Sequence, residues 1–455
     1  MIKNLKSIIC CCAILSMQLT AAYANQPTEI NNNLPAPEYH PISQTKITKK
    51  SAISLPEAIA YAIKNNPKIN ASRARLNAFK HDVRVQVGHF LPKIGVYLSQ
   101  GIQTNHAPTL INAGLSEKDL YPEQSSINLE QIVYDGGKNT SQKHMYDALT
   151  QSALYNLADV EQKVIIATIQ AYLQVEMSNQ IIKYRKNKLV ALKNLKYKTQ
   201  YAKINYKQRS NLLKLISANI LSARIDYHKI QADNKSAKIN FLTITNLYPK
   251  YLKIARLPKM NFSSDVQNYV IEAYKNNPQI LEQIARVKAA KQRINAAKAN
   301  FYPKLGINVG YSYGHDIQLI SGKQQDFEAN AAISYNLFNG GSDSAKVMAQ
   351  ENITSVAQAK LVQKYREVRQ NVENNWLTIY SNQTNKVDLT NYINFTSKAY
   401  ALSLSKASSS SAYLSNALAM LNKKYSAKEN LLKLKYQSVI AYYKILAEQG
   451  KLATV

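Results

Sequence analysis

The sequence predicts a mostly α-helical chain with a small β part, arranged as two internal repeats of long, coiled-coil-like helices and paired strands. Three observations lead to this fold class. Glycine and proline are confined to a few windows of the 455-residue chain, apolar residues recur at helical spacing between those windows, and short motifs return in the same order in both halves. Since Gly and Pro are costly inside helices, long segments without them are free to be helical.

The first residues have the layout of a secretory signal peptide. A basic start with Lys3 and Lys6 precedes an apolar run that ends in Ala22-Tyr23-Ala24, a small-x-small cleavage pattern. We therefore expect residues 1–24 to be removed and residues 25–53 to form an N-terminal leader.

All three cysteines lie inside the predicted signal peptide, at Cys10, Cys11 and Cys12. The mature chain is then expected to form no disulfide and no thiolate site. A lipid anchor would need a cysteine at the end of the apolar run, and these three lie too early for that alternative.

The charge balance is strongly basic, with 58 Lys and Arg against 28 Asp and Glu. Such an excess suggests contact with polyanions such as lipopolysaccharide, acidic cargo or nucleic acid, of which export makes nucleic acid the weakest. No uninterrupted apolar stretch of about 18 residues follows the signal peptide, so no α-helical membrane anchor is expected.

Two long segments are predicted to be helical hairpins. No Gly or Pro lies between Lys138 and Tyr248 or between Ser342 and Gln449. Apolar residues follow three- and four-residue steps there, as in Leu361, Tyr365, Val368, Val372, Trp376 and Ile379. We expect long helices at 137–205, 207–247, 342–405 and 411–449, the third about 95 Å long at 1.5 Å per residue.

The glycine-bearing windows alternate apolar and polar residues with a period of two, which predicts strands at about 90–103, 123–135, 302–314 and 326–339. We expect two hairpins. Aromatic residues lie in or beside the strands, which suits a lipid-facing barrel; a small soluble sheet is the alternative. These aromatic residues are Tyr97, Tyr121, Tyr134, Tyr302, Tyr335 and Phe338.

The chain is an internal duplication. Asn-Asn-Pro ends at Pro67 and again at Pro278, and an aromatic-x-Pro-Lys motif contains Pro92 and then Pro303. An aromatic-x-Gly-Gly motif closes the second strand of each half, at Gly136-Gly137 and Gly340-Gly341. The first repeat is expected at 54–250 and the second at 251–455, which opens with a helix at 265–300. Each half is predicted as helix, Pro kink, strand, loop, strand, long helix and returning helix.

Four antiparallel strands leave two open edges, and the smallest closed membrane barrels have about eight strands. If these strands enter a membrane, several chains must share one barrel. The long helices that continue from the strand ends would then form a second wall.

With these motifs, the sequence resembles the TolC family of outer-membrane efflux and secretion channels from about Ser54 to Leu452. The resemblance implies a homotrimer with a shared 12-stranded outer-membrane β-barrel and a periplasmic helical barrel, in a Gram-negative outer membrane. The implied partners are outer-membrane lipid, a periplasmic adaptor (membrane fusion) protein and an inner-membrane pump of the RND, ABC or MFS type. No cofactor, metal or nucleic acid is expected.

The resemblance also implies a periplasmic gate at the turns between paired helices, where an acidic ring is common in the family. Here the matching positions carry no carboxylate, which puts a cation-binding constriction in doubt. The gate positions expected are Tyr206, Arg209, Ser210 and Asn211 in the first half and Lys406, Ser408, Ala412 and Ser415 in the second. The run Ser408 to Ser411 is either a flexible gating turn or a simple connection.

Two further features leave alternatives open. The stretch from Lys183 to Arg209 carries ten basic residues and no acidic one. It is either a positively charged approach to the tunnel mouth or an ordinary solvated helix face. The two Gly-Gly pairs are best interpreted as strand-to-helix junctions where the backbone needs positive φ or close packing.

Enzymatic function finds little support. Ligand spacings such as His-Glu-x-x-His, the Gly-x-Ser-x-Gly elbow and the P-loop do not occur. The seven histidines are His40, His81, His89, His106, His144, His228 and His315. The predicted function is a passive exit duct for efflux of small molecules or type I protein secretion. The alternatives are a periplasmic or surface coiled-coil scaffold that binds polyanions and, more remotely, an exported hydrolase.

Overall fold

The computed structural model describes residues 52–103, 121–255, 264–317, 322–408 and 410–452. The predicted signal peptide and nearly all of the predicted leader lie outside the described residues. The first half contains α2 (Leu55–Asn65), α3 (Pro67–Gly88), β1 (Lys93–Gln100), β2 (Glu123–Tyr134), α5 (Lys138–Gln200) and α6 (Tyr206–Thr245). The second half contains α7 (Val266–Asn276), α8 (Pro278–Lys298), β3 (Lys304–His315), β4 (Lys323–Ser334), α9 (Ser342–Ser405) and α10 (Ser411–Glu448).

The segment expected as one helix at 265–300 is two helices, α7 and α8, followed by a 3-10 turn at Ala299–Phe301. The break comes from Asn277, whose side-chain Oδ1 accepts hydrogen bonds from the backbone N–H of Gln279 at 2.9 Å and of Ile280 at 3.2 Å. Pro278 occupies the first helical position, where a missing N–H costs nothing. Asn66 and Pro67 begin α3 in the same way. Pro67 and Pro278 therefore each start a new helix and do not kink a continuous one.

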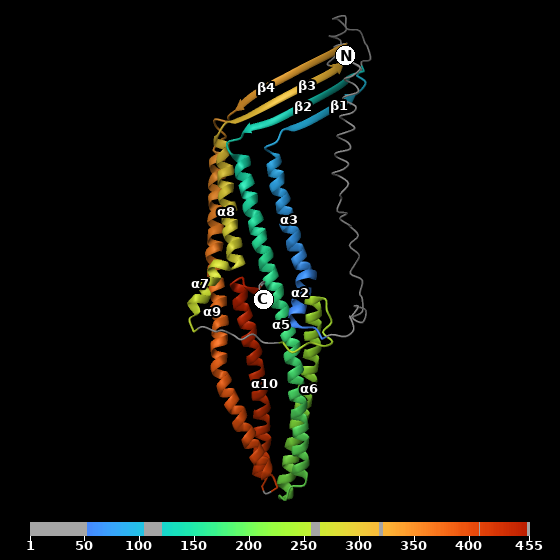
Figure 1. The fold of residues 1–455 in the computed structure, drawn as a ribbon, viewed down its shortest axis with the longest axis vertical. Helices are drawn as coiled ribbons and strands as arrows, with labels where there is room; N and C mark the ends of the chain where they lie inside the picture. The colour runs from blue at the N-terminus through green and yellow to red at the C-terminus, as the bar shows by residue number, and fades with distance from the viewer. Residues whose placement is uncertain (1–51, 104–120, 256–263, 318–321, 409, 453–455) are drawn as a thin grey trace. The chain divides into compact units, whose positions relative to one another are not determined.

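The four strands form one antiparallel sheet in the order β1-β2-β3-β4 (Figure 1). The expected hairpins are present, and β2 also pairs with β3, which joins the two repeats through backbone hydrogen bonds. The register places Val96 opposite Ile127, Ile127 opposite Tyr311 and Tyr311 opposite Phe327, so apolar side chains from all four strands share one face.

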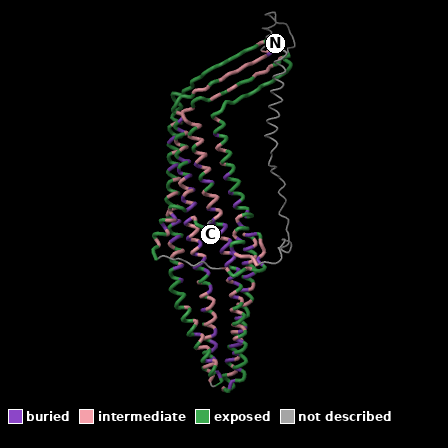
Figure 2. The backbone as a smooth tube through the Cα atoms, in the orientation of Figure 1, coloured by how far each residue is buried: buried purple, intermediate pink, exposed green. Residues whose placement is uncertain are grey.

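This apolar face is open in the single chain. Ile94, Val96 and Leu98 of β1 are each about two-thirds exposed, and Phe327 and Ile333 of β4 are at least as exposed. Figure 2 shows the strands as mostly exposed and intermediate residues, whereas buried residues lie along the helices. Strands β1 and β4 each have a second edge that pairs with no described strand.

The helices pack around α5, which contacts α3, α6, α8 and α10, while α9 packs on α7, α8 and α10. Nearest the sheet run α3, α5, α8 and the start of α9. Farther from it, α5 pairs with α6 and α9 pairs with α10, and both hairpins end at the same side of this unit (Figure 1). None of the described helices has an apolar stretch long enough to cross a membrane.

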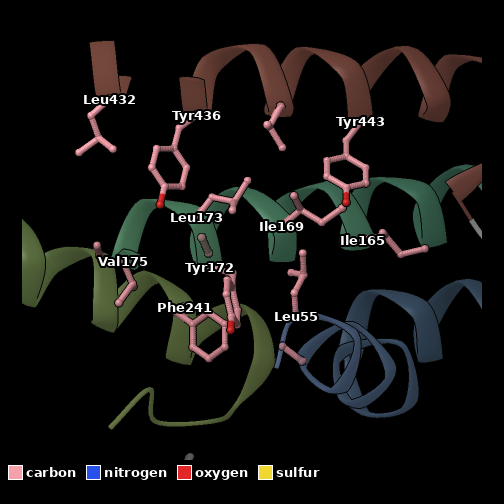
Figure 3. Packing of buried hydrophobic residues seen from close by; sticks show 14 of the residues in the cluster. Leu55, Ile165, Ile169, Tyr172, Leu173, Val175, Phe241, Leu432, Tyr436 and Tyr443 are labelled. Atoms are coloured by element: carbon pink, nitrogen blue, oxygen red, sulfur yellow. The ribbon is translucent and has the colours of Figure 1, made fainter. Parts of the chain in front are cut away.

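The main core lies midway along α5, between α10 on one side and α2 and α6 on the other (Figure 3). Tyr172 is fully buried there, and its ring meets the Phe241 ring edge-on at a centroid distance of 6.1 Å. Its hydroxyl lies 2.9 Å from the carbonyl oxygen of Ile53. Burial raises the pKa of the Tyr172 hydroxyl, so it stays a neutral hydrogen-bond donor. These contacts hold the middle of the long helices in a fixed register.

Candidate functional site at the two helical turns

The two hairpin turns lie together at the end of the helices farthest from the sheet (Figure 1). One buried apolar cluster joins them, with contributions from the turns themselves at Ala202 and Ala407. The cluster also contains residues of α5, α6 and α10. These are Leu192, Leu195, Leu212, Ile216, Ile220, Ala223, Leu414, Ala417, Leu418 and Leu421. Apolar burial therefore holds the four helix ends as one packed unit.

The first turn, between α5 and α6, is held by Arg209 and Asn205. The guanidinium of Arg209 donates from Nη2 to the carbonyl oxygens of Ala202 at 3.0 Å and Ile204 at 3.1 Å. Asn205 caps α6 by accepting a hydrogen bond from the N–H of Lys207 at 2.9 Å. The Nε of Arg209 is buried and has no hydrogen-bond partner among the described residues. Arg209 therefore stabilises the turn from inside.

Other predicted positions of the first turn are accessible. Tyr206 opens α6 and is 81% exposed. Asn211 is exposed, and Ser210 is partly buried. The first turn thus exposes the Tyr206 ring and the Asn211 amide, while Arg209 holds its backbone.

The second turn, between α9 and α10, has contacts made by Ser410, Asn416 and Lys406. Ser410 caps α10 by accepting a hydrogen bond from the N–H of Ala412 at 3.2 Å, and Asn416 donates across the hairpin to the Ser403 hydroxyl at 2.9 Å. The Lys406 ammonium lies 5.8 Å from the centre of the Tyr413 ring. These contacts connect the last turn of α9 with the first two turns of α10.

The predicted positions Ser408, Ala412 and Ser415 are all exposed. Ala412 and Ser415 are three residues apart at the start of α10 and therefore share one helix face. Ser409 lies outside the described residues.

Sequence reasoning missed a largely buried ion pair between two of the helices. Arg185 of α5 forms a two-pronged ion pair with Glu429 of α10, in which Nε to Oε1 and Nη2 to Oε2 are both 3.2 Å. Arg185 also donates from Nη1 to the backbone oxygen of Asp226 on α6. Because Arg185 and Glu429 are 244 positions apart, no local pattern could have identified the pair.

The junction glycines adopt the expected backbone. The φ angles are +71° at Gly136, +82° at Gly137, +57° at Gly340 and +77° at Gly341. Only Gly136 is also crowded, because an added Cβ there would lie 2.5 Å from the oxygen of Ala299. Among the residues that the structure describes, no group of three or more His, Cys, Asp or Glu could hold a metal ion.

Comparison with known proteins gives a consistent family signal. The family model described as outer membrane efflux protein matches residues 58–208 and 270–446. The outer membrane efflux protein BepC of Brucella suis biovar 1 (strain 1330) is 23% identical over 345 residues, covering 74% of this chain and 72% of BepC. The outer membrane protein TolC of Vibrio cholerae serotype O1 is 22% identical over 344 residues, covering 70% of this chain and 73% of TolC.

Among solved structures, CusC has the same fold. The CusC structure was described in connection with folding and transmembrane channel formation. It superposes with a TM-score of 0.75 at 14% sequence identity, over 89% of this chain and 95% of the CusC chain.

Proposed function

Because the chain belongs to the outer membrane efflux protein family, we propose that it is one subunit of a trimeric duct that carries cargo from the periplasm through the outer membrane. The family places it in the outer membrane, extending into the periplasm, as a transport protein and not an enzyme. The observation that carries the proposal is the open apolar face of the four-stranded sheet, together with its two unpaired edges.

The sheet argues for closure by other copies of the chain. Lipid offers no hydrogen bonds, so an unpaired strand edge inside a membrane costs several kcal/mol per group. Pairing β1 of one copy with β4 of the next would satisfy both edges. Three copies would give a barrel of twelve strands, with the apolar face toward lipid. The opposite face, which carries Asn128, Asn308 and Asn330, would line a polar interior.

Helix α9 supports the same assembly. It buries few residues in the single chain and exposes a series of large apolar side chains along its length. These are Met348, Ile353, Val356, Val362, Leu377, Tyr380, Val387, Tyr392, Phe395 and Leu402. Side chains of this kind are expected to pack against neighbouring copies. A coiled-coil scaffold without a channel is the weaker alternative, because it would not need the open apolar sheet.

The two turns are the proposed gate. The positions in the first turn are Tyr206, Arg209, Ser210 and Asn211, and those in the second are Lys406, Ser408, Ala412 and Ser415. In this proposal the α9–α10 turn is the part that moves, while Arg209, which donates to two backbone oxygens, keeps the α5–α6 turn fixed. A periplasmic adaptor would shift the equilibrium toward the open state by binding that state more tightly. An inner-membrane pump of the RND, ABC or MFS type would supply energy, for efflux of small molecules or for type I secretion.

Single-channel conductance of the detergent-extracted protein in planar bilayers tests the proposal. Discrete openings with anion preference are expected under a salt gradient, because the turns carry Lys207, Arg209 and Lys406 and no carboxylate. The double substitution Ala412→Asp and Ser415→Asp should shift the reversal potential toward cations. The control is Asn240→Asp with Thr243→Asp, an exposed pair of the same spacing at the other end of α6, which should leave selectivity closer to that of the wild type. A protein that never conducts would refute the duct.

A further inference from the structure

A polar cavity of about 310 Å³ lies where α8 begins and α10 ends, between α5 and α9 (Figure 1). Its volume is enough for a small organic molecule. The wall combines charged side chains, side-chain amides and a few apolar residues, all from one chain. The two helical turns contribute no residue to this wall, so the cavity is separate from the proposed gate.

The Glu448 carboxylate lies in this wall and is held by neutral amides. Asn277 donates from Nδ2 to Oε2 at 2.7 Å, and Asn371 donates from Nδ2 to Oε1 at 3.0 Å. No described Lys, Arg or His forms an ion pair with Glu448, and burial raises the pKa of its carboxyl. The negative charge of Glu448 is therefore only partly compensated by the protein.

A positive charge in the same wall also has no counter-ion. Lys444 lies four residues before Glu448 on α10, so the two side chains start from one helix face. They form no ion pair with each other, and Lys before Glu is the less favourable order for such a pair. The other acid and base of the wall, Asp159 and Lys163, already pair at 2.6 Å. One group of each sign is thus left for a ligand.

Gln162 adds an unmet hydrogen bond. This residue lines the cavity from α5 and is 6% exposed. Its Oε1 is buried and has no partner among the described residues, which is costly for an amide oxygen. Because the terminal amide can turn about its last side-chain bond, this oxygen can be presented to a ligand in the cavity. A ligand that donates a hydrogen bond would satisfy it.

We propose that the cavity binds a small zwitterion, namely a free α-amino acid with an aliphatic side chain. The ammonium group of the ligand donates to Glu448 and to Gln162 Oε1, and its carboxylate accepts from Lys444. The two charged groups of an α-amino acid are bonded to one carbon, which suits two partners that are neighbours on one helix face. Ile166 and Ala447 supply apolar wall for the side chain of the ligand.

Isothermal titration calorimetry of the detergent-solubilised full chain at neutral pH tests the proposal with three matched probes. L-leucine carries both charged groups, isopentylamine lacks only the carboxylate, and isocaproate lacks only the ammonium group. L-leucine should bind saturably at one site per chain, and each of the other probes at least about tenfold more weakly. Equal affinities for L-leucine and isopentylamine would overturn the proposal, and so would the absence of saturable L-leucine binding.

Substitutions assign each end of the ligand. Glu448→Gln and Lys444→Gln should each weaken L-leucine binding by about tenfold, because each removes one charge-assisted contact. Lys444→Gln should not weaken isopentylamine binding, since that probe has no carboxylate. Gln162→Met should weaken L-leucine binding by about threefold. Unchanged L-leucine affinity in Glu448→Gln and Lys444→Gln would mean that the ligand binds elsewhere, which refutes the assignment.

The matched controls are Glu351→Gln and Lys346→Gln, which remove one exposed charge of each sign from the part of α9 near the sheet. Each should change L-leucine affinity by less than about twofold. Losses equal to those of the cavity variants would contradict the proposed site. Thermal melts by circular dichroism check that every variant is folded. The cavity is complete in one chain, so binding can be present or absent whether or not the protein conducts.

Discussion

The Asn277 side chain ties the start of α8 to the end of α10 by donating from Nδ2 to Glu448, at 3.0 Å to the backbone oxygen and 2.7 Å to the carboxylate. Asn66 makes the equivalent contact in the first half, where its Nδ2 donates to the backbone oxygen of Ile244 at 3.1 Å. The duplicated Asn-Asn-Pro motif thus does two things in each repeat. It starts a helix, and it attaches that start to the end of the returning helix.

Replacement of Asn277 by Ala should destabilise the protein by about 2 kcal/mol, because it removes a helix cap and leaves polar groups of Glu448 with fewer partners. Asn66→Ala should cost less, about 1 kcal/mol, since Asn66 makes a single hydrogen bond to α6. Thermal unfolding followed by circular dichroism in detergent measures both. Equal Tm shifts for the two variants would contradict the added role of the Glu448 carboxylate.

Glu448 should make stability depend on pH. Burial raises the pKa of its carboxyl, with a smaller contribution from the charge of Asp159, while hydrogen bonds from Asn371 and Asn277 and the charge of Lys364 act in the opposite direction. A raised folded-state pKa means that the folded protein holds the proton more tightly than the unfolded chain. The folded state should therefore gain stability as pH falls through the folded pKa toward the ordinary value of 4.5.

Glu448→Gln should raise Tm near neutral pH and flatten its change on acidification, since the amide carries no charge to desolvate. A series of melts from about pH 7 to about pH 4.5 checks this. The control is Glu351→Gln, an exposed glutamate of α9, which should leave the slope unchanged. An unaltered slope in Glu448→Gln would count against the assignment.

The two Gly-Gly junctions should respond differently to alanine. Gly340→Ala has open space around it and should cost about 1 to 2 kcal/mol, the ordinary cost of positive φ for a residue with a side chain. Gly136→Ala adds a clash, because its Cβ would lie 2.5 Å from the Ala299 oxygen and 2.9 Å from the Tyr302 Cβ. We expect a clearly larger Tm loss for Gly136→Ala. Similar losses at both positions would mean that the Ala299 turn moves aside easily.

The Arg185–Glu429 pair should fix α5 against α10. Both side chains are mostly buried, at 18% and 15% exposure, so removal of one partner leaves the other charge without its counter-ion. Arg185→Met or Glu429→Gln should each cost about 2 kcal/mol, less than a fully buried pair would. Arg185→Lys should not restore stability, because an ammonium cannot make the two-pronged contact.

A double-mutant cycle of Arg185→Met and Glu429→Gln should give a coupling energy of about 1 kcal/mol or more. If the gate opens by movement of α10 relative to α5, the single variants should also raise the open probability in planar bilayers. Additive Tm losses with unchanged gating would show that the two residues act independently.

The local features of this protein were determined by its sequence. The Gly- and Pro-free segment that predicts a helix at 342–405 corresponds to α9 at Ser342–Ser405, because helix limits depend on residues close in the chain. The alternation of apolar and polar residues likewise located the strands to within a few residues, since alternation is a local pattern. The break in the helix predicted at 265–300 was missed, because capping by Asn277 depends on how its side chain is oriented.

Only the tertiary structure decided which distant residues meet. It joined β2 to β3 in one sheet, paired Arg185 with Glu429, attached Asn277 to Glu448, and brought the two helical turns to one end. A pattern in sequence records the spacing of residues along the chain, whereas these contacts depend on how helices of 38 to 64 residues pack side by side. The packing of these helices depends on many buried side chains together, so no single motif predicts it.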